Sequence, residues 1–186
     1  MRLAYRLVTA TAAALLLAGC SPLGQGTGSS SGDGDRGSGT EGSVGKASFD
    51  NNTKPIVKGT FDSPEAQGAK VDIAIMGLKV KGKLATLTVQ FVPHVPGAQP
   101  NQINAYGLNG ERGLDTSLID PVNLKRYVVV KDSSGRELQT DDIFTHMTND
   151  QPTSSFYTFA APPDSVKSID VQLGNWPTFR DVPVER

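Results

Sequence analysis

The amino-acid sequence predicts an all-β protein whose folded part is an antiparallel β-sandwich. Several segments alternate hydrophobic and polar residues with the period of two that is typical of half-buried strands. Turn signals separate these segments, and the chain of 186 residues contains 20 Gly and 12 Pro, which are residues that end strands and form turns. No segment combines a long 3.6-residue period with capping residues at its ends, which argues against a helical protein.

Residues 69–80 and 84–92 are the clearest strands. Val and Ile occupy every second position from residue 71 to 75 in the first segment, and Ala, Leu, Val and Phe do so from residue 85 to 91 in the second. Lys81 and Gly82 lie between them, and a glycine accepts the positive φ that a tight turn requires. The two segments are therefore predicted to form a β-hairpin.

Further strands are predicted between this hairpin and the C-terminus. An Asp-Ser-Ser-Gly sequence at residues 132–135 predicts a turn, and two prolines in residues 161–165 end a strand because proline cannot donate to a ladder. About seven short strands separated by such turns are typical of an immunoglobulin-like sandwich. The further strands are expected at residues 126–130, 137–141, 154–161 and 167–173.

The N-terminal residues 1–19 have the features of a secretory signal peptide. Arg2 and Arg6 precede an apolar run, residues 7–17, that is too short to span a bilayer. The run ends in Leu-Ala-Gly-Cys, which resembles the bacterial lipobox. This resemblance implies cleavage before Cys20, a diacylglyceryl group on its sulfur, and acylation of the new amino group by a fatty acid such as palmitate. The alternative is an ordinary secreted protein with an incidental cysteine.

The composition of the chain changes twice along its length. Residues 20–48 are rich in Gly, Ser and Thr and contain almost no large apolar residue, so they cannot bury enough surface to fold. We expect a disordered tether there, with a root-mean-square span of roughly 25–30 Å. Residues 49–186 are expected to form the β-sandwich, held at the extracytoplasmic face of the cell membrane.

Residues 116–135, 159–173 and 175–184 resemble a module of actinobacterial surface lipoproteins. Their sequences are TSLIDPVNLKRYVVVKDSSG, FAAPPDSVKSIDVQL and NWPTFRDVPV. In that family the module often precedes a peptidoglycan-binding domain of the outer-membrane-protein-A type, and more distantly it is similar to telokin-like, immunoglobulin-fold extracellular proteins. The resemblance implies a β-sandwich and offers no catalytic residues. Because the sequence ends at Arg186, we do not expect wall binding through that further domain.

Composition excludes several classes of function. The formal net charge of −1 gives no general attraction to nucleic acid. One cysteine and two histidines provide neither a disulfide framework nor a Cys-rich metal site. In residues 49–186, the part expected to fold, no Gly-x-Ser-x-Gly elbow marks a nucleophilic serine. We therefore expect a non-catalytic protein without cofactor.

The leading hypothesis is an adapter module that contacts another envelope protein through loops on a rigid scaffold. The long irregular stretch, residues 93–123, is the expected contact surface, and Trp176 lies in a second aromatic segment that either joins this surface or fills one end of the sandwich. The residues singled out for partner contact are Tyr106, Leu108, Asn123 and Trp176.

Two other sets of residues give alternatives. His94, His146 and Asp142 carry the side chains of a small-ligand or metal-binding site if the fold brings them together. Three lysines at the predicted hairpin tip, Lys79, Lys81 and Lys83, would contact anionic lipid headgroups or wall polymers. The competing interpretation of these lysines is an edge hairpin kept soluble by charge.

Overall fold

The computed structural model describes residues 54–99 and 102–186. The predicted signal peptide, Cys20 and the predicted tether lie outside the described residues. No helix of the described residues has the length and apolar character needed to cross a membrane. The described elements are β1 (Val57–Asp62), β2 (Lys70–Lys81), β3 (Leu84–His94), β4 (Ile103–Asn104), α1 (Ala105–Leu108), β5 (Ser117–Asp120), β6 (Lys125–Val128), β7 (His146–Met147), β8 (Thr153–Ala160), β9 (Ser168–Gln172) and β10 (Phe179–Pro183).

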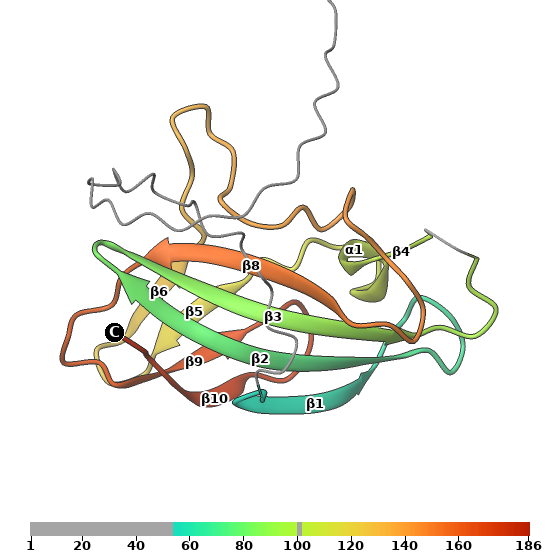
Figure 1. Ribbon diagram of the computed structural model, residues 1–186, viewed down its shortest axis with the longest axis horizontal. Helices are drawn as coiled ribbons and strands as arrows, with labels where there is room; N and C mark the ends of the chain where they lie inside the picture. The colour runs from blue at the N-terminus through green and yellow to red at the C-terminus, as the bar shows by residue number, and fades with distance from the viewer. Residues whose placement is uncertain (1–53, 100–101) are drawn as a thin grey trace, which may run out of the picture. The chain divides into compact units, whose positions relative to one another are not determined.

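Two four-stranded antiparallel sheets form the body of the fold (Figure 1). The first sheet has the order β1-β2-β3-β8 and the second the order β10-β9-β5-β6, while β4 and β7 form a small separate pair. Buried side chains from both sheets join one hydrophobic core, and Phe61 of β1 meets Phe179 of β10 edge-to-face with ring centroids 5.7 Å apart. The predicted fold class, an all-β antiparallel sandwich, is confirmed.

The β2–β3 hairpin is the longest paired element of the first sheet. Its register runs from Lys70 opposite His94 to Lys81 opposite Leu84, and the buried positions alternate along both strands as the sequence indicates. Gly82 has φ of 62° in the turn, a conformation that favours glycine. The predicted hairpin is confirmed.

A bulge in β2 lets the C-terminal residues join the first sheet. The register of β2 against β3 shifts between Ile75 and Gly77. Beyond this shift, the β2 segment around Lys79 pairs in parallel with Glu185, through N–H donors from Val80 and Glu185. The last residues of the chain therefore cover the part of β2 that β1 leaves free.

The structure corrects the predicted strand at residues 137–141. This segment forms only isolated bridges, from Glu137 to Lys131 and from Gln139 to Tyr157. Thr140 accepts the N–H of Phe156 with its side-chain hydroxyl instead of its carbonyl, which breaks the regular ladder. The segment is therefore one side of a protruding hairpin rather than a strand of the sandwich.

The stretch between β3 and β6 is more regular than the sequence indicates. It contains β4, the one-turn helix α1 and β5. Asn104 caps α1 by accepting the N–H of Gly107 on its side-chain oxygen. β5 pairs with both β6 and β9, so part of the predicted surface loop is an interior strand of the second sheet.

Candidate functional site

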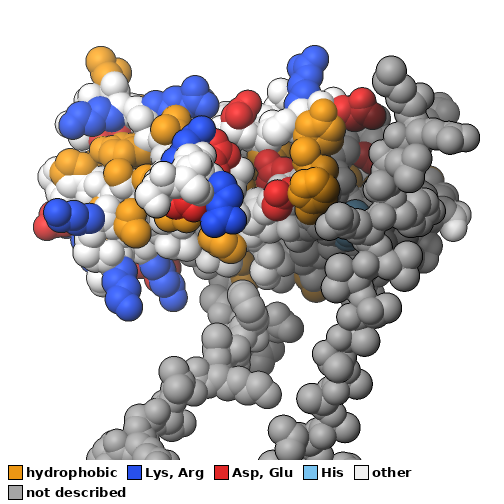
Figure 2. Space-filling view, turned by 90° about the horizontal axis from the view of Figure 1, so that it is seen from above, with side chains coloured by type: hydrophobic (Ala, Val, Ile, Leu, Met, Phe, Trp, Pro, Cys, Tyr) orange, Lys and Arg blue, Asp and Glu red, His pale blue; other side chains and the backbone are white. Residues whose placement is uncertain are grey.

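A groove of about 690 Å³ lies beside the hairpin of residues 131–139, which we call the arm. The arm rises above β8 in Figure 1. Figure 2 views the molecule from the side toward which the arm projects, and shows hydrophobic side chains among Lys/Arg and Asp/Glu side chains on this face. We call this hollow the arm groove; its lining residues are Tyr106, Gly113, Lys131, Asp132, Gly135, Arg136, Glu137, Leu138, Gln139, Asp141, Asp142, Ile143 and Phe156.

The sequence of the arm fixes its turn. The carboxylate of Asp132 accepts hydrogen bonds from the N–H groups of Ser134 and Arg136 and from the Ser134 hydroxyl. These contacts hold the pKa of Asp132 below its usual value, with the Ser134 side-chain hydrogen bond as the largest cause. The Asp-Ser-Ser-Gly turn predicted from the sequence is present, and Gly135 has φ of 84°.

Backbone hydrogen bonds join the base of the arm to β8. Val130 donates to the carbonyl of Thr158, Thr158 donates to Leu138, and Leu138 donates to Val130. Thr140 donates to the carbonyl of Phe156. Because the arm is bonded to an edge of the first sheet, the arm groove is formed on a fixed scaffold.

The apolar part of the arm groove comes from four side chains. Ile143 and Phe156 are 46% and 48% exposed, and Leu138 is 37% exposed; Tyr106 of α1 is half-buried. Exposed large hydrophobic residues that gather in a hollow mark binding surfaces more often than isolated ones do.

Asp142 is a partly buried carboxyl of the groove lining. One of its oxygens accepts the N–H of Leu114 at 3.0 Å, and the other has no hydrogen-bond partner among the described residues. Burial raises the pKa of Asp142 above its usual value, and the Leu114 hydrogen bond opposes this only in part. The Tyr157 side chain is fully buried; burial raises the pKa of Tyr157, and the charge of Asp142 adds to this rise.

Replacing Asp142 by Asn should stabilise the protein at neutral pH, whereas replacing it by Ala should destabilise it. The pKa of the Asp142 carboxyl is higher in the folded state than in the unfolded state. Such a carboxyl lowers the free energy of unfolding as the pH rises from its unfolded-state pKa through its folded-state pKa. The Asn amide keeps an acceptor for Leu114 and carries no charge. Ala leaves that buried N–H without a partner, at a cost of about 1–3 kcal/mol.

Urea denaturation of both variants at pH 4 and pH 7 tests this expectation. The stability advantage of Asp142→Asn over the wild type should grow between the two pH values. Equal losses of stability in the Asn and Ala variants would show that the carboxylate charge is not the unfavourable group.

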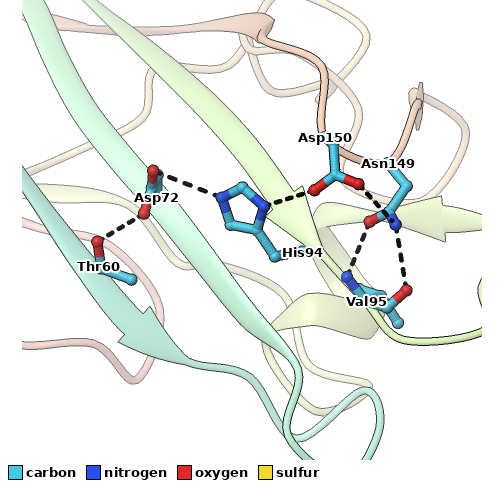
Figure 3. A network of polar contacts seen from close by, with 6 residues as sticks. All are labelled: Thr60, Asp72, His94, Val95, Asn149 and Asp150. Carbon is cyan, nitrogen blue, oxygen red and sulfur yellow. Dashed lines mark hydrogen bonds and ion pairs between the residues drawn. The ribbon is translucent and has the colours of Figure 1, made fainter.

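A second polar cluster, shown in Figure 3, joins strands β1, β2 and β3 to the loop before β8. The His94 imidazole contacts Asp150 through Nδ1 at 2.7 Å and Asp72 through Nε2 at 3.5 Å. The Thr60 hydroxyl donates to Asp72 at 2.6 Å. Because the two carboxylates lie against opposite ring nitrogens, the histidine connects β2, which carries Asp72, to the loop before β8, which carries Asp150.

The loop before β8 is also held at Asn149. Its side-chain amide accepts the N–H of Val95 at 2.8 Å and donates to the Val95 carbonyl at 3.2 Å. The Asp150 N–H donates to the carbonyl of Pro93 at 2.8 Å. This arrangement fastens the loop to the end of β3.

The His94 network should make stability depend on pH near neutrality. Hydrogen bonding to Asp150 is the largest cause that raises the pKa of His94 above 6.5. The network's contribution to the free energy of unfolding is therefore complete below the unfolded-state pKa of His94, about 6.5. It is lost as the pH rises through the folded-state pKa of His94. The effect should be at most about 1 kcal/mol, because solvent screens exposed pairs, and the His94 side chain is 39% exposed.

Thermal unfolding of the wild type and His94→Gln between pH 5.5 and pH 8.5 measures this contribution. The difference in melting temperature should shrink as pH increases. A difference that stays constant with pH would mean that the charged imidazole does not contribute.

The structure separates the four residues predicted to contact a partner. Tyr106 lines the arm groove, and Asn123 is exposed on the β5–β6 turn. Leu108 is fully buried and Trp176 is 6% exposed. The prediction of Leu108 and Trp176 as partner contacts is corrected: both side chains pack in the core, where a partner has no access.

The residues of the alternative site do not meet. His94 contacts Asp72 and Asp150, His146 is exposed on β7, and Asp142 lines the arm groove. No cluster of three or more His, Cys, Asp or Glu side chains with metal-binding geometry occurs in residues 54–99 and 102–186. The condition for this alternative site, that the fold brings the three side chains together, is therefore not met.

Two of the three predicted basic contacts are exposed at the hairpin tip. Lys81 and Lys83 flank Gly82 on the surface. Lys79 also lies at the surface, where its ammonium group is 3.7 Å from the Glu185 carboxylate.

Sequence reasoning missed most of the arm groove. Leu138, Ile143 and Phe156 come from three segments that only the bonds between the arm and β8 bring together. The sequence shows that these three residues are hydrophobic. Many hydrophobic residues of a β-protein pack in the core and line no site, so hydrophobicity alone did not identify them. Asp150 was missed as well, because its partner His94 lies 56 residues away.

Comparisons with known proteins found no match. No family model matches the chain, and neither a curated protein nor a solved structure is similar to it at the significance required.

Proposed function

We propose that this protein is a lipid-anchored, extracytoplasmic binding module that contacts another envelope protein through the arm groove. The anchor is the acylated Cys20 implied by the lipobox-like sequence. The single observation that carries the binding function is the arm groove, with its exposed apolar side chains and charged rim on a hydrogen-bonded scaffold.

The lining of the arm groove supports a protein partner. Protein interfaces combine an apolar centre with a polar rim. Here Ile143 and Phe156 supply exposed apolar surface, while Lys131, Arg136 and Glu137 add charge of both signs. Such a rim favours a partner segment that also carries both charges.

A photo-reactive amino acid at Leu138 tests this proposal in intact cells. The residue lines the groove and is partly exposed. We expect crosslinking to capture a defined envelope protein, and we expect the Ile143→Ser/Phe156→Ser double variant to reduce capture at least about tenfold, as loss of interface anchors does.

The matched control is Val128→Ser. Val128 is 62% exposed and lies on β6, outside the groove lining. Capture should be unchanged in this variant. The proposal fails if no protein is captured above the level of uncrosslinked cells, or if the double variant captures the same protein equally well.

A small-molecule ligand is the second candidate for the arm groove. Its volume of about 690 Å³ lies within the range of small-molecule pockets, and its lining combines apolar side chains with charged ones. A ligand of the arm groove should raise the melting temperature of the wild type, and should raise it less in Ile143→Ser/Phe156→Ser.

A further inference from the structure

Three connections meet at one end of the sandwich, and we call this region the basic end. It comprises the β2–β3 turn at residues 81–83, the β5–β6 turn with the start of β6 at residues 121–126, and the β8–β9 connection at residues 161–167. Leu84 pairs with Ala160 in the first sheet, and Ala161 donates to the carbonyl of Lys83. In the second sheet the end of β5 lies beside the start of β9.

Positive charge predominates in these three connections. Their only acidic side chain is that of Asp164, and Arg186 engages it at 3.2 Å. Figure 2 shows Lys and Arg side chains gathered toward the left of the view. The positive residues of the three connections are Lys81, Lys83, Lys125, Arg126 and Lys167.

The connections at the other end of the sheets have the opposite character. The segments 63–69, 95–99 and 148–152 contain no Lys or Arg, and they carry Glu65 and Asp150. Charge is thus distributed asymmetrically along the strands, although the whole chain has a formal net charge of only −1.

The β5–β6 turn adds exposed hydrophobic surface to the basic end. Val122 and Leu124 are 86% and 90% exposed, which exceeds every other exposed large hydrophobic residue among the described ones. Leu124 has φ of 54°, a conformation that is unfavourable for a residue with a bulky side chain. The turn therefore presents two apolar side chains to solvent at a conformational cost.

Asp120 holds this turn in place. One oxygen of its carboxylate accepts the N–H groups of Val122 and Asn123, and the other accepts the Asn123 side-chain amide at 2.7 Å. Asn123, singled out from the sequence as a partner contact, therefore supports the turn that displays its neighbours. The tip has a defined conformation.

We infer that the basic end docks on an anionic lipid surface. Val122 and Leu124 enter the headgroup region, and the five positive side chains lie against lipid phosphates. Apolar tip residues next to a cluster of basic ones are the combination that holds peripheral proteins at such surfaces. A protein interface would instead place its apolar residues in a centre depleted of charge.

The direction of the chain agrees with this orientation. β1 runs from Val57, opposite Ile75, to Asp62, opposite Lys70, and therefore away from the basic end. The first described strand thus begins opposite the middle of β2 and is directed away from the lipid surface. Docking rests on the proposed lipid anchor only for bringing the module to a membrane.

Vesicle co-sedimentation tests the inference without an acyl anchor or a protein partner. The protein is residues 20–186 with Cys20→Ser, which keeps every residue that the structure describes. It is mixed with phosphatidylcholine vesicles with and without about 30% phosphatidylglycerol, a fraction that gives the surface a negative potential. We expect binding only to the anionic vesicles, and weaker binding when salt is raised to about 0.5 M.

Two double variants separate the apolar and the electrostatic contributions. Val122→Ser/Leu124→Ser should weaken binding to anionic vesicles at least about tenfold, because each removes apolar surface that enters the interface. Lys81→Gln/Lys83→Gln should weaken it roughly tenfold or more, because each lysine near a charged surface contributes about fivefold. Phe144→Ser, which removes a 79% exposed side chain outside the basic end, should have no effect.

Three results would overturn the inference. They are the absence of binding to anionic vesicles, equal binding to neutral vesicles, and undiminished binding of the Val122→Ser/Leu124→Ser variant. Circular dichroism of each variant verifies that the fold is intact. The Ile143→Ser/Phe156→Ser variant should bind vesicles normally, so failure of docking and failure of the arm-groove proposal are distinguishable.

Discussion

The Trp176→Ala variant is expected to lose about 3–5 kcal/mol of its free energy of unfolding, the usual cost of removing a buried large aromatic side chain. Trp176 is 6% exposed, and its indole ring lies 6.3 Å from the ring of Phe91. The indole N–H donates to the carbonyl of Asp62 at 3.2 Å. The variant therefore loses both packing volume and the partner of a backbone carbonyl at the end of β1.

Urea denaturation followed by far-ultraviolet circular dichroism measures this loss, because the chain has no other tryptophan to report by fluorescence. Trp176→Phe is the matched comparison: it keeps an aromatic ring in the core, loses the hydrogen bond, and should lie between the wild type and the Ala variant. A loss below about 1 kcal/mol in Trp176→Ala, typical of surface substitutions, would contradict the placement of this side chain in the core.

The Cys20→Ser variant is expected to lose stable membrane association in cells. If Cys20 carries a diacylglyceryl group and an amide-linked acyl chain, each buried methylene contributes about 0.8 kcal/mol, and several chains together make dissociation negligible. Serine lacks the thiolate on which the lipid is transferred. After cell fractionation at high salt, the wild type should remain with membranes and the variant should not.

Any membrane association that the Cys20→Ser variant keeps at low salt measures docking through the basic end. Docking through the basic end alone should be weak and released by salt, because exposed charges are screened over about 8 Å at physiological ionic strength. Salt-resistant membrane association of the variant, or a wild-type mass without bound acyl groups, would contradict lipid anchoring at Cys20.

The elements predicted correctly from the sequence are those determined by residues close together in the chain. The β2–β3 hairpin combines the period of two with a Lys81-Gly82 turn, and Asp132 fixes the arm turn through contacts within four residues. Asp120, directly before Pro121, likewise accepts N–H groups two and three residues ahead. Hydrogen bonds this short in sequence depend little on the remainder of the fold.

Elements that depend on distant partners were not predicted. β5 is Ser-Leu-Ile-Asp, with three of four residues buried, and so lacks the alternation of a half-exposed strand. It lies between β6 and β9 in the second sheet. A short interior strand of this kind shows no period of two, because both of its faces are covered.

The candidate site was predicted only in part for the same reason. Tyr106 and Asp142 were singled out separately. They converge because the segment after the arm lies against α1, where the backbone N–H of Tyr106 donates to the carbonyl of Asp142. The prediction of Leu108 as a surface contact was wrong, and of the two alternatives for Trp176 the structure shows the core. Hydrophobic residues in irregular segments occupy the core as readily as those in strands. Burial of such residues depends on tertiary packing.

The length of β2 also has a consequence for how far from a bilayer the module would act. A strand of 12 residues is on the order of 40 Å long. With the basic end against lipid, the loop fastened by His94 and Asn149 would stand at nearly that height, at the other end of the hairpin. A flexible tether alone would leave the distance between this loop and the membrane variable, whereas docking through the basic end would fix it. The module would then meet other envelope proteins at a defined distance from the membrane.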